Sequence, residues 1–160
     1  MDLINRKRNR LPNFDYSAEG YYFITICTFE KKNLLCEIVE SKEYIIQINL
    51  SKLGEITKLQ LFDIEKRFKN VTIDKYVIMP NHIHIIFKCN KNDYAPTLSN
   101  IVRAFKSLVT ITYKKHYEIA NIWQKSFYDH IIRDETDYLR ICEYIESNPL
   151  KWSEDKYYVK

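Results

Sequence analysis

Two of the chain's four histidines, His82 and His84, stand two positions apart in a run of apolar residues. Residues 79–87 read MPNHIHIIF, and their β-branched and aromatic side chains predict a strand. Side chains alternate between the faces of a strand, so both imidazoles would project from the same face. Two neighbouring imidazoles can each donate a ring nitrogen to one divalent cation. The alternative is that one or both histidines are ordinary, partly buried polar residues.

Tyr144 and Asn148 form a second pair of residues that could take part in chemistry, near the end of the last predicted helix. They are four residues apart and therefore lie on the same side of the helix, one turn from each other. Together with the two histidines they would supply two imidazoles, an amide oxygen and a phenol. Such ligands suit Mg²⁺ or Mn²⁺ and leave positions open for a phosphate. The chain has thirteen tyrosines, so an ordinary surface tyrosine is the alternative for Tyr144.

The elements that must position these residues follow an α+β order. We expect strands over residues 21–29, 34–39, 44–48, 72–79, 82–89 and 127–132, with the second and third beside the first. We expect helices over residues 51–68, from residue 98 onwards, and from residue 134 to the break at Pro149. Ser51 and Asp134 are the predicted N-caps of the first and last helix. An antiparallel sheet with helices packed on one face would bury the apolar stripes.

Length and composition indicate one globular domain. The chain has 160 residues, of which 46% are hydrophobic and 29% are charged. No apolar run approaches the ~18 residues of a membrane span, and the charged N-terminus does not resemble a secretory signal. Two glycines are too few for a Gly-rich phosphate loop. Four cysteines without a C-x-x-C pair are typical of reduced core thiols in a cytoplasmic protein: Cys27, Cys36, Cys89 and Cys142.

Basic residues exceed acidic residues by 25 to 21, which does not by itself imply a nucleic-acid partner. Their distribution gives two groups of candidate contacts to DNA phosphates: Arg6, Lys7, Arg8 and Arg10 near the N-terminus, and Arg103 and Lys106 on a helix. Thirteen tyrosines and eight phenylalanines offer flat surfaces on which bases could stack. The alternative is that the lysines keep the surface soluble and the aromatic residues fill the core.

Six sequence motifs are distributed along the chain: DY at residues 15–16, GYYFIT at 20–25, MPNHIHIIF at 79–87, IWQ at 122–124, FYDHIIR at 127–133 and YIESNPLKW at 144–152. In these motifs the chain resembles the single-tyrosine HUH transposases, particularly the REP-associated tyrosine transposases. The resemblance extends from about residue 11 to residue 152 and so covers nearly the whole chain.

The resemblance implies a role for each candidate residue. The family's two metal-binding histidines match His82 and His84. Its nucleophilic tyrosine lies four residues before a Gln or Asn that assists metal binding, and these positions match Tyr144 and Asn148, although insertion-sequence relatives carry Gln at the latter. The implied fold is an antiparallel sheet of ferredoxin-like or RRM-like kind with the histidines on a central strand. We expect a single catalytic domain over residues 1–160, with a basic arm at 1–12 and a short tail at 150–160.

The activity implied by the resemblance is cleavage and strand transfer of single-stranded DNA with Mg²⁺ or Mn²⁺. Tyrosine attack would leave a 5′-phosphotyrosine and a free 3′-OH, and a second 3′-OH could reseal the strand without ATP. The implied partner is DNA folded into a hairpin. We expect the protein in the cytoplasm, at the nucleoid, and we expect no membrane partner. The target sequence, and the choice between a monomer and a homodimer, stay open. Two alternatives remain: a non-catalytic RRM-like binder that stacks bases on the sheet, and a metal-dependent nuclease that releases its product.

Overall fold

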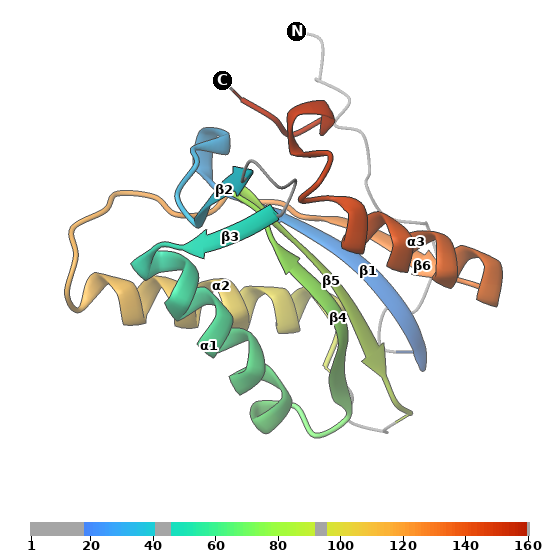
Figure 1. Cartoon of the computed structure of the whole chain (residues 1–160). Coiled ribbons are helices and arrows are strands. Elements are labelled where there is room, and N and C mark those ends of the chain that lie inside the picture. The colour runs from blue at the N-terminus through green and yellow to red at the C-terminus, as the bar shows by residue number, and fades with distance from the viewer. Residues whose placement is uncertain (1–17, 41–45, 92–95, 160) are drawn as a thin grey trace, which may run out of the picture.

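A four-stranded antiparallel sheet lies at the centre of the molecule (Figure 1). The computed structural model describes residues 18–40, 46–91 and 96–159. The strand order is β4-β5-β1-β6. The strands are β1 (Gly20–Cys27), β4 (Val71–Ile78), β5 (His82–Cys89) and β6 (Tyr128–Ile132). Since β5 carries both histidines and has neighbours on each side, the prediction of a central strand is confirmed.

Two helices complete a β-α-β-β-α-β unit with this sheet. Helix α1 (Lys52–Arg67) connects β1 with β4, and helix α2 (Leu98–Lys114) connects β5 with β6. This element order and strand order define the ferredoxin-like or RRM-like arrangement, which confirms the predicted fold class.

The expectation that two further strands lie beside the first is wrong. Strands β2 (Cys36–Glu40) and β3 (Ile46–Leu50) pair with each other in a separate two-stranded sheet. The physical reason is that β1 has no free edge, because β5 pairs along its whole length on one side and β6 pairs on the other.

One face of the central sheet is covered by α1 and α2, in an apolar core. The residues of β1 and β5 that take part alternate with residues that do not, as the period of a strand requires. The buried members from the two strands are Tyr22, Ile24, Ile26, Ile83, Ile85 and Phe87. They pack with apolar residues of both helices, among them Leu61 and Phe105.

The opposite face of the sheet is covered by α3 (Glu135–Ser147), which Figure 1 shows on the other side of the strands from α1 and α2. Phe23 and Ile86 point to this face and pack with Ile141, Cys142 and Ile145 of α3. The expectation that all helices pack on one face is therefore wrong. The sequence predicts the apolar stripe of α3, but α1 and α2 fill the first face of the sheet, so α3 is buried against the second.

Helix ends follow local sequence signals. The Ser51 hydroxyl accepts a hydrogen bond from Gly54 N (3.0 Å), and the Asp134 carboxylate accepts one from Asp137 N (2.8 Å). Both predicted N-caps are thereby confirmed. Helix α3 ends at Ser147, with Asn148 as its C-cap, so the predicted break at Pro149 is confirmed.

The four cysteines are buried, and none forms a disulfide. Burial raises the pKa of Cys36 to about 12 and that of Cys89 to about 11, so these thiols are protonated and unreactive at neutral pH. In the part of the chain that the structure describes, no helix is long and apolar enough to cross a membrane.

Candidate metal and nucleophile site

His82 and His84 lie fully buried on β5, on the face of the sheet that α3 covers. Their Nε2 atoms are 3.0 Å apart, so both rings direct the same nitrogen at one point. The prediction that the two imidazoles share a face is confirmed by this contact.

The ring orientation of His82 is fixed by Asn81. The Asn81 Nδ2 group donates to the carbonyl oxygens of Lys31 (3.1 Å) and Tyr157 (2.8 Å). Since both of its donors go to carbonyl oxygens, Asn81 Oδ1 must be the acceptor in the 2.9 Å contact with His82 Nδ1. His82 Nδ1 therefore carries the proton, and the neutral ring presents a bare lone pair at Nε2, the form that a metal requires.

His84 is held by a hydroxyl that suits either tautomer. Its Nδ1 is 2.8 Å from Thr25 Oγ1 on the neighbouring strand β1. Since His82 Nε2 carries no proton, His84 Nε2–H is the donor in the 3.0 Å contact between the two rings, and Thr25 donates to His84 Nδ1. When a cation is bound at both Nε2 atoms, the His84 proton must reside on Nδ1, and the Thr25 hydroxyl can then accept from it.

Burial keeps both imidazoles neutral. It lowers the pKa of His82 to about 4, although the nearby Asp155 carboxylate raises it. Burial also lowers the pKa of His84, and the neighbouring His82 and Lys156 add to this effect. Neither ring therefore carries a positive charge that would oppose a cation at neutral pH.

Tyr144 of α3 lies directly against the histidines. Its ring centre is 5.1 Å from that of His84 and 6.1 Å from that of Phe23, which it meets edge-on. Its hydroxyl is 3.4 Å from Asp155 Oδ2. Burial raises the pKa of Tyr144 above its usual value, and the charge of Asp155 raises it further, so the phenol is protonated at neutral pH.

Asn148, at the end of α3, offers an oxygen without a partner. Its Nδ2 donates to Asp155 Oδ2 (2.7 Å), whereas its buried Oδ1 accepts no hydrogen bond from any described residue. An unpaired buried carbonyl group costs about 1–3 kcal/mol, so a ligand is its expected partner. This oxygen and the bare Nε2 of His82 fit a divalent cation.

Asp155 and Tyr157 belong to the site but could not be identified in the sequence. Ligand atoms of His82, His84 and Asp155 all lie within 4.8 Å of one another. The ring centre of Tyr157 is 4.6 Å from that of His82, and its backbone N–H donates to Asp155 Oδ1 (2.6 Å). Residues 150–159 carry no periodic pattern, and their position depends on the chain folding back over the sheet after α3.

Of the predicted DNA-contacting residues, the two that the structure describes, Arg103 and Lys106, are not brought to this site. Arg6, Lys7, Arg8 and Arg10 lie outside the described residues. Arg103 is exposed on α2, which covers the other face of the sheet, and donates to Asn100 Oδ1 (3.0 Å).

Lys106, also on α2, has partners within the protein. Its ammonium group donates to the carbonyl oxygens of Gln124 (2.8 Å), Lys125 (3.4 Å) and Ser126 (2.9 Å). Burial lowers the pKa of Lys106 to about 8. This residue holds the segment that leads into β6, and its contact with DNA stays a prediction.

Comparison with known proteins places the chain within a family. Residues 19–148 match the family described as IS200-like transposases. An uncharacterised protein of Haemophilus influenzae is 39% identical over 97% of this chain and 94% of its own length. A second protein of that organism, provisionally named a REP-associated tyrosine transposase, is 30% identical over 86% of this chain and 74% of its own. The REP-associated tyrosine transposase of Escherichia coli is 33% identical over 54% of this chain and 48% of its own.

A solved structure shares the fold. It is a REP-associated tyrosine transposase bound to a REP hairpin, and it superposes with a TM-score of 0.65 at 22% identity. The superposition covers 92% of this chain and 77% of the other. The antiparallel sheet with its helices is therefore the fold of that transposase.

Proposed function

Because the chain belongs to the family of IS200-like transposases, we propose that it cuts and rejoins single-stranded DNA with Tyr144 as nucleophile and Mg²⁺ or Mn²⁺ as cofactor. One observation carries the proposal. A phenol, two neutral imidazoles and an unpaired amide oxygen meet on one face of the sheet, from elements about 60 residues apart along the chain.

Four side chains could hold the cation. His82 and His84 would contribute their Nε2 atoms, and Asn148 its free Oδ1. Asp155 lies within reach as an oxygen ligand. A bound divalent cation supplies charge that polarises the scissile phosphate and stabilises the transition state.

Tyr144 would act as the nucleophile in the first step. Its oxygen bonds to the phosphorus, the bond from phosphorus to the 3′ oxygen breaks, and that oxygen takes a proton to become a free 3′-OH. The phenol must lose its proton at the same time, and the Asp155 carboxylate at 3.4 Å is placed to accept it. The product is a 5′-phosphotyrosine, and a second 3′-OH can attack it, restore the phosphodiester and release Tyr144.

The proposed DNA partner is a hairpin with an unpaired flank. A relative with this fold was solved with a REP hairpin, and a strand must be single to reach a phenol that lies against a sheet. Affinity should fall as salt rises, with a slope of about 0.7 per neutralised phosphate for single strands. Contacts from Arg103, Lys106 and the N-terminal cluster stay predictions.

Covalent trapping distinguishes this proposal from the two alternatives. Labelled hairpin DNA is incubated with the protein and Mn²⁺, and the mixture is resolved on a denaturing gel. Wild-type protein should form an adduct that excess EDTA prevents. Tyr144→Phe should bind the DNA but form no adduct, whereas the matched variant Tyr138→Phe should form it. Cleavage without an adduct would favour a nuclease that releases its product, and binding without cleavage would favour a non-catalytic binder.

A further inference from the structure

A cavity of about 540 Å³ opens beside Tyr144. Its walls come from β6, from α3 and from the segment after α3. Tyr144 and Asn148 lie on one wall, so the cavity begins where the proposed reaction takes place. Its volume is in the range of small-ligand sites.

The register of the sheet places two side chains of β6 in this cavity. Tyr128 stands opposite Thr25 in the antiparallel pair of β1 and β6, and His130 stands opposite Phe23. Residues directly opposite each other point to the same face of a sheet. Tyr128 and His130 therefore share the face of the metal-binding histidines, and both line the cavity.

The aromatic ring of Tyr128 is accessible from the cavity. Tyr128 is 45% exposed, whereas Phe23, which also lines the cavity, is 7% exposed. The Lys156 ammonium group lies over the ring of Tyr128, 5.5 Å from its centre. A flat, accessible ring beside a cation is the arrangement on which single-stranded bases stack in nucleic-acid-binding sheets.

Cationic side chains surround the opening of the cavity. Lys151, Lys156 and Arg140 all line it. Arg140 has an exposed side chain whose partner is Asp137 on its own helix (2.6 Å). Two carboxylates also line the cavity, and that of Asp155 is bonded to Asn148, whereas that of Glu154 is not. The three cations outnumber these two carboxylates, which favours a phosphate group in the cavity.

We propose that this cavity binds the unpaired nucleotide next to the phosphate that Tyr144 attacks, with its base stacked on Tyr128. The inference rests on the proposed function, since it takes Tyr144 as the nucleophile. In this proposal Tyr128 is a substrate-binding residue, and the flanking phosphate is bound by Arg140, Lys151 and Lys156. The stacked base would hold the strand in place while its neighbouring phosphate meets the phenol.

Equilibrium binding in EDTA tests the cavity without any cleavage. The probe is a fluorescein-labelled hairpin with unpaired flanks, whose flank sequence is first selected from a randomised pool by the wild-type protein. Each flank base is then replaced in turn by an abasic site. One position should weaken wild-type binding by about 5- to 150-fold, which corresponds to about 1–3 kcal/mol for one stacked base.

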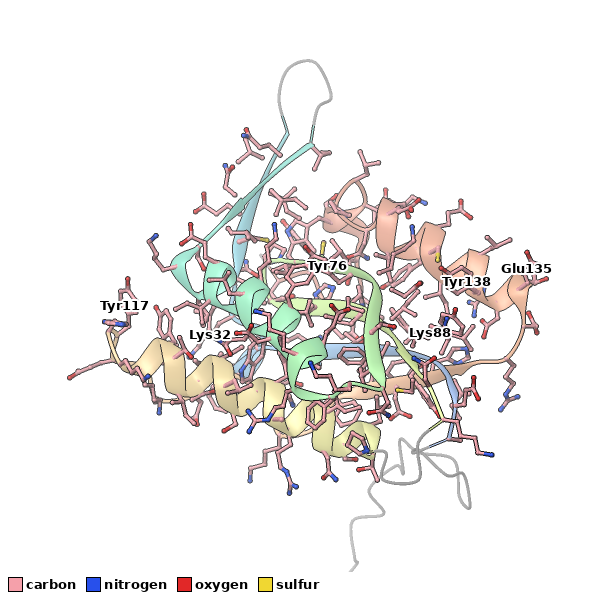
Figure 2. All side chains as sticks on the ribbon, turned by 90° about the horizontal axis from the view of Figure 1, so that it is seen from below. Lys32, Tyr76, Lys88, Tyr117, Glu135 and Tyr138 are labelled. Atoms are coloured by element: carbon pink, nitrogen blue, oxygen red, sulfur yellow. The ribbon has the colours of Figure 1, made fainter. Side chains whose placement is uncertain are left out.

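Tyr128→Ala should weaken binding of the intact probe by the same factor. The affinity of this variant should not fall further when the abasic site is introduced at that position. Tyr128→Phe keeps the ring and should behave as the wild type, which separates stacking from a folding defect. Tyr117→Ala is a matched control, because Tyr117 is similarly exposed (41%) but lies just after α2, far from α3 in Figure 2.

The inference is overturned if no flank position is sensitive, if no flank sequence is selected, or if Tyr128→Ala keeps the wild-type response. These outcomes are distinct from failure of the proposed function. A sensitive position without a Tyr144 adduct would support the cavity and reject the nucleophile, whereas an adduct without a sensitive position would do the reverse.

Discussion

The two faces of the central sheet use the same strands for different purposes. On one face β1 and β5 place Tyr22, Ile24 and Ile85 in a continuous apolar core under α1 and α2. On the other face the neighbouring positions of the same strands carry Phe23, Thr25 and two histidines beneath α3. Adjacent residues of the same strand therefore have different roles: one packs in the apolar core, and the next lies in the candidate site.

Most of the buried polar side chains on the second face have hydrogen-bond partners. Thr25 and Asn81 each bond one histidine, and Asp155 bonds the Asn148 amide. Among the described side chains, one carbonyl oxygen, that of Asn148, is buried and unpaired, and it points to a ligand. The first face is built for stability and the second for binding, and four changes test that division.

The largest effect is expected on the apolar face. Phe105 of α2 is completely buried there, so Phe105→Ala should lower the free energy of unfolding by about 3–5 kcal/mol. Tyr144→Phe on the other face removes one oxygen and should change it by less than about 1 kcal/mol. Urea denaturation of both variants measures the difference, and equal losses would contradict the division.

Acid should destabilise the polar face. The pKa of His82 is about 4 in the folded protein, below its usual value of about 6.5, so the unfolded chain binds the proton more readily. Stability should therefore be lost as pH falls from about 6.5 towards 4, by about 3 kcal/mol for this group. His82→Gln does not titrate and should lose less over the same range in thermal or urea denaturation. Parallel pH profiles would show that His82 is not held neutral.

Asn81 should control metal affinity through His82. Asn81→Leu removes the acceptor for His82 Nδ1–H and should weaken Mn²⁺ binding by about 10- to 100-fold in isothermal titration calorimetry. Asn81→Asp keeps an acceptor oxygen and should retain the affinity, although it loses both donors to the Lys31 and Tyr157 carbonyls. If both variants bind Mn²⁺ as the wild type does, Asn81 does not set the tautomer.

The smallest effects should be alike on the two faces. Ser51 caps α1 and Asp134 caps α3 through the same kind of hydrogen bond, and the Ser51 hydroxyl also donates to the Leu34 carbonyl oxygen (2.6 Å). Replacing either residue by Ala should cost about 1 kcal/mol of unfolding free energy. A much larger loss at one of them would show that its helix depends on more than local capping, and thermal denaturation gives the comparison.

Local signals made much of this molecule predictable. The alternation of residues 82–87 placed both histidines on one face, and Ser51 and Asp134 marked two helix starts. Spacing also put Tyr144 and Asn148 on one side of α3, and the structure brings both beside the histidines.

What could not be predicted depends on contacts between distant segments. The pairing of β2 with β3, and the face chosen by α3, follow from which surfaces are already occupied. Asp155 reaches the site because the chain returns over the sheet after Pro149, and Asn81 is tied to Tyr157 across 76 positions. No periodic pattern in a single segment encodes such an arrangement.

The most direct test of the polar face as a catalytic centre is to locate the covalent link to DNA by mass spectrometry. Trypsin separates the candidate tyrosines, because Tyr128, Tyr138 and Tyr144 fall in the peptides of residues 126–133, 134–140 and 141–151. Wild-type protein treated with hairpin DNA and Mn²⁺ should carry the phosphonucleotide on the third peptide, and excess EDTA should abolish it. A link on either of the other peptides, or a link that forms in EDTA, would contradict Tyr144 as a metal-dependent nucleophile.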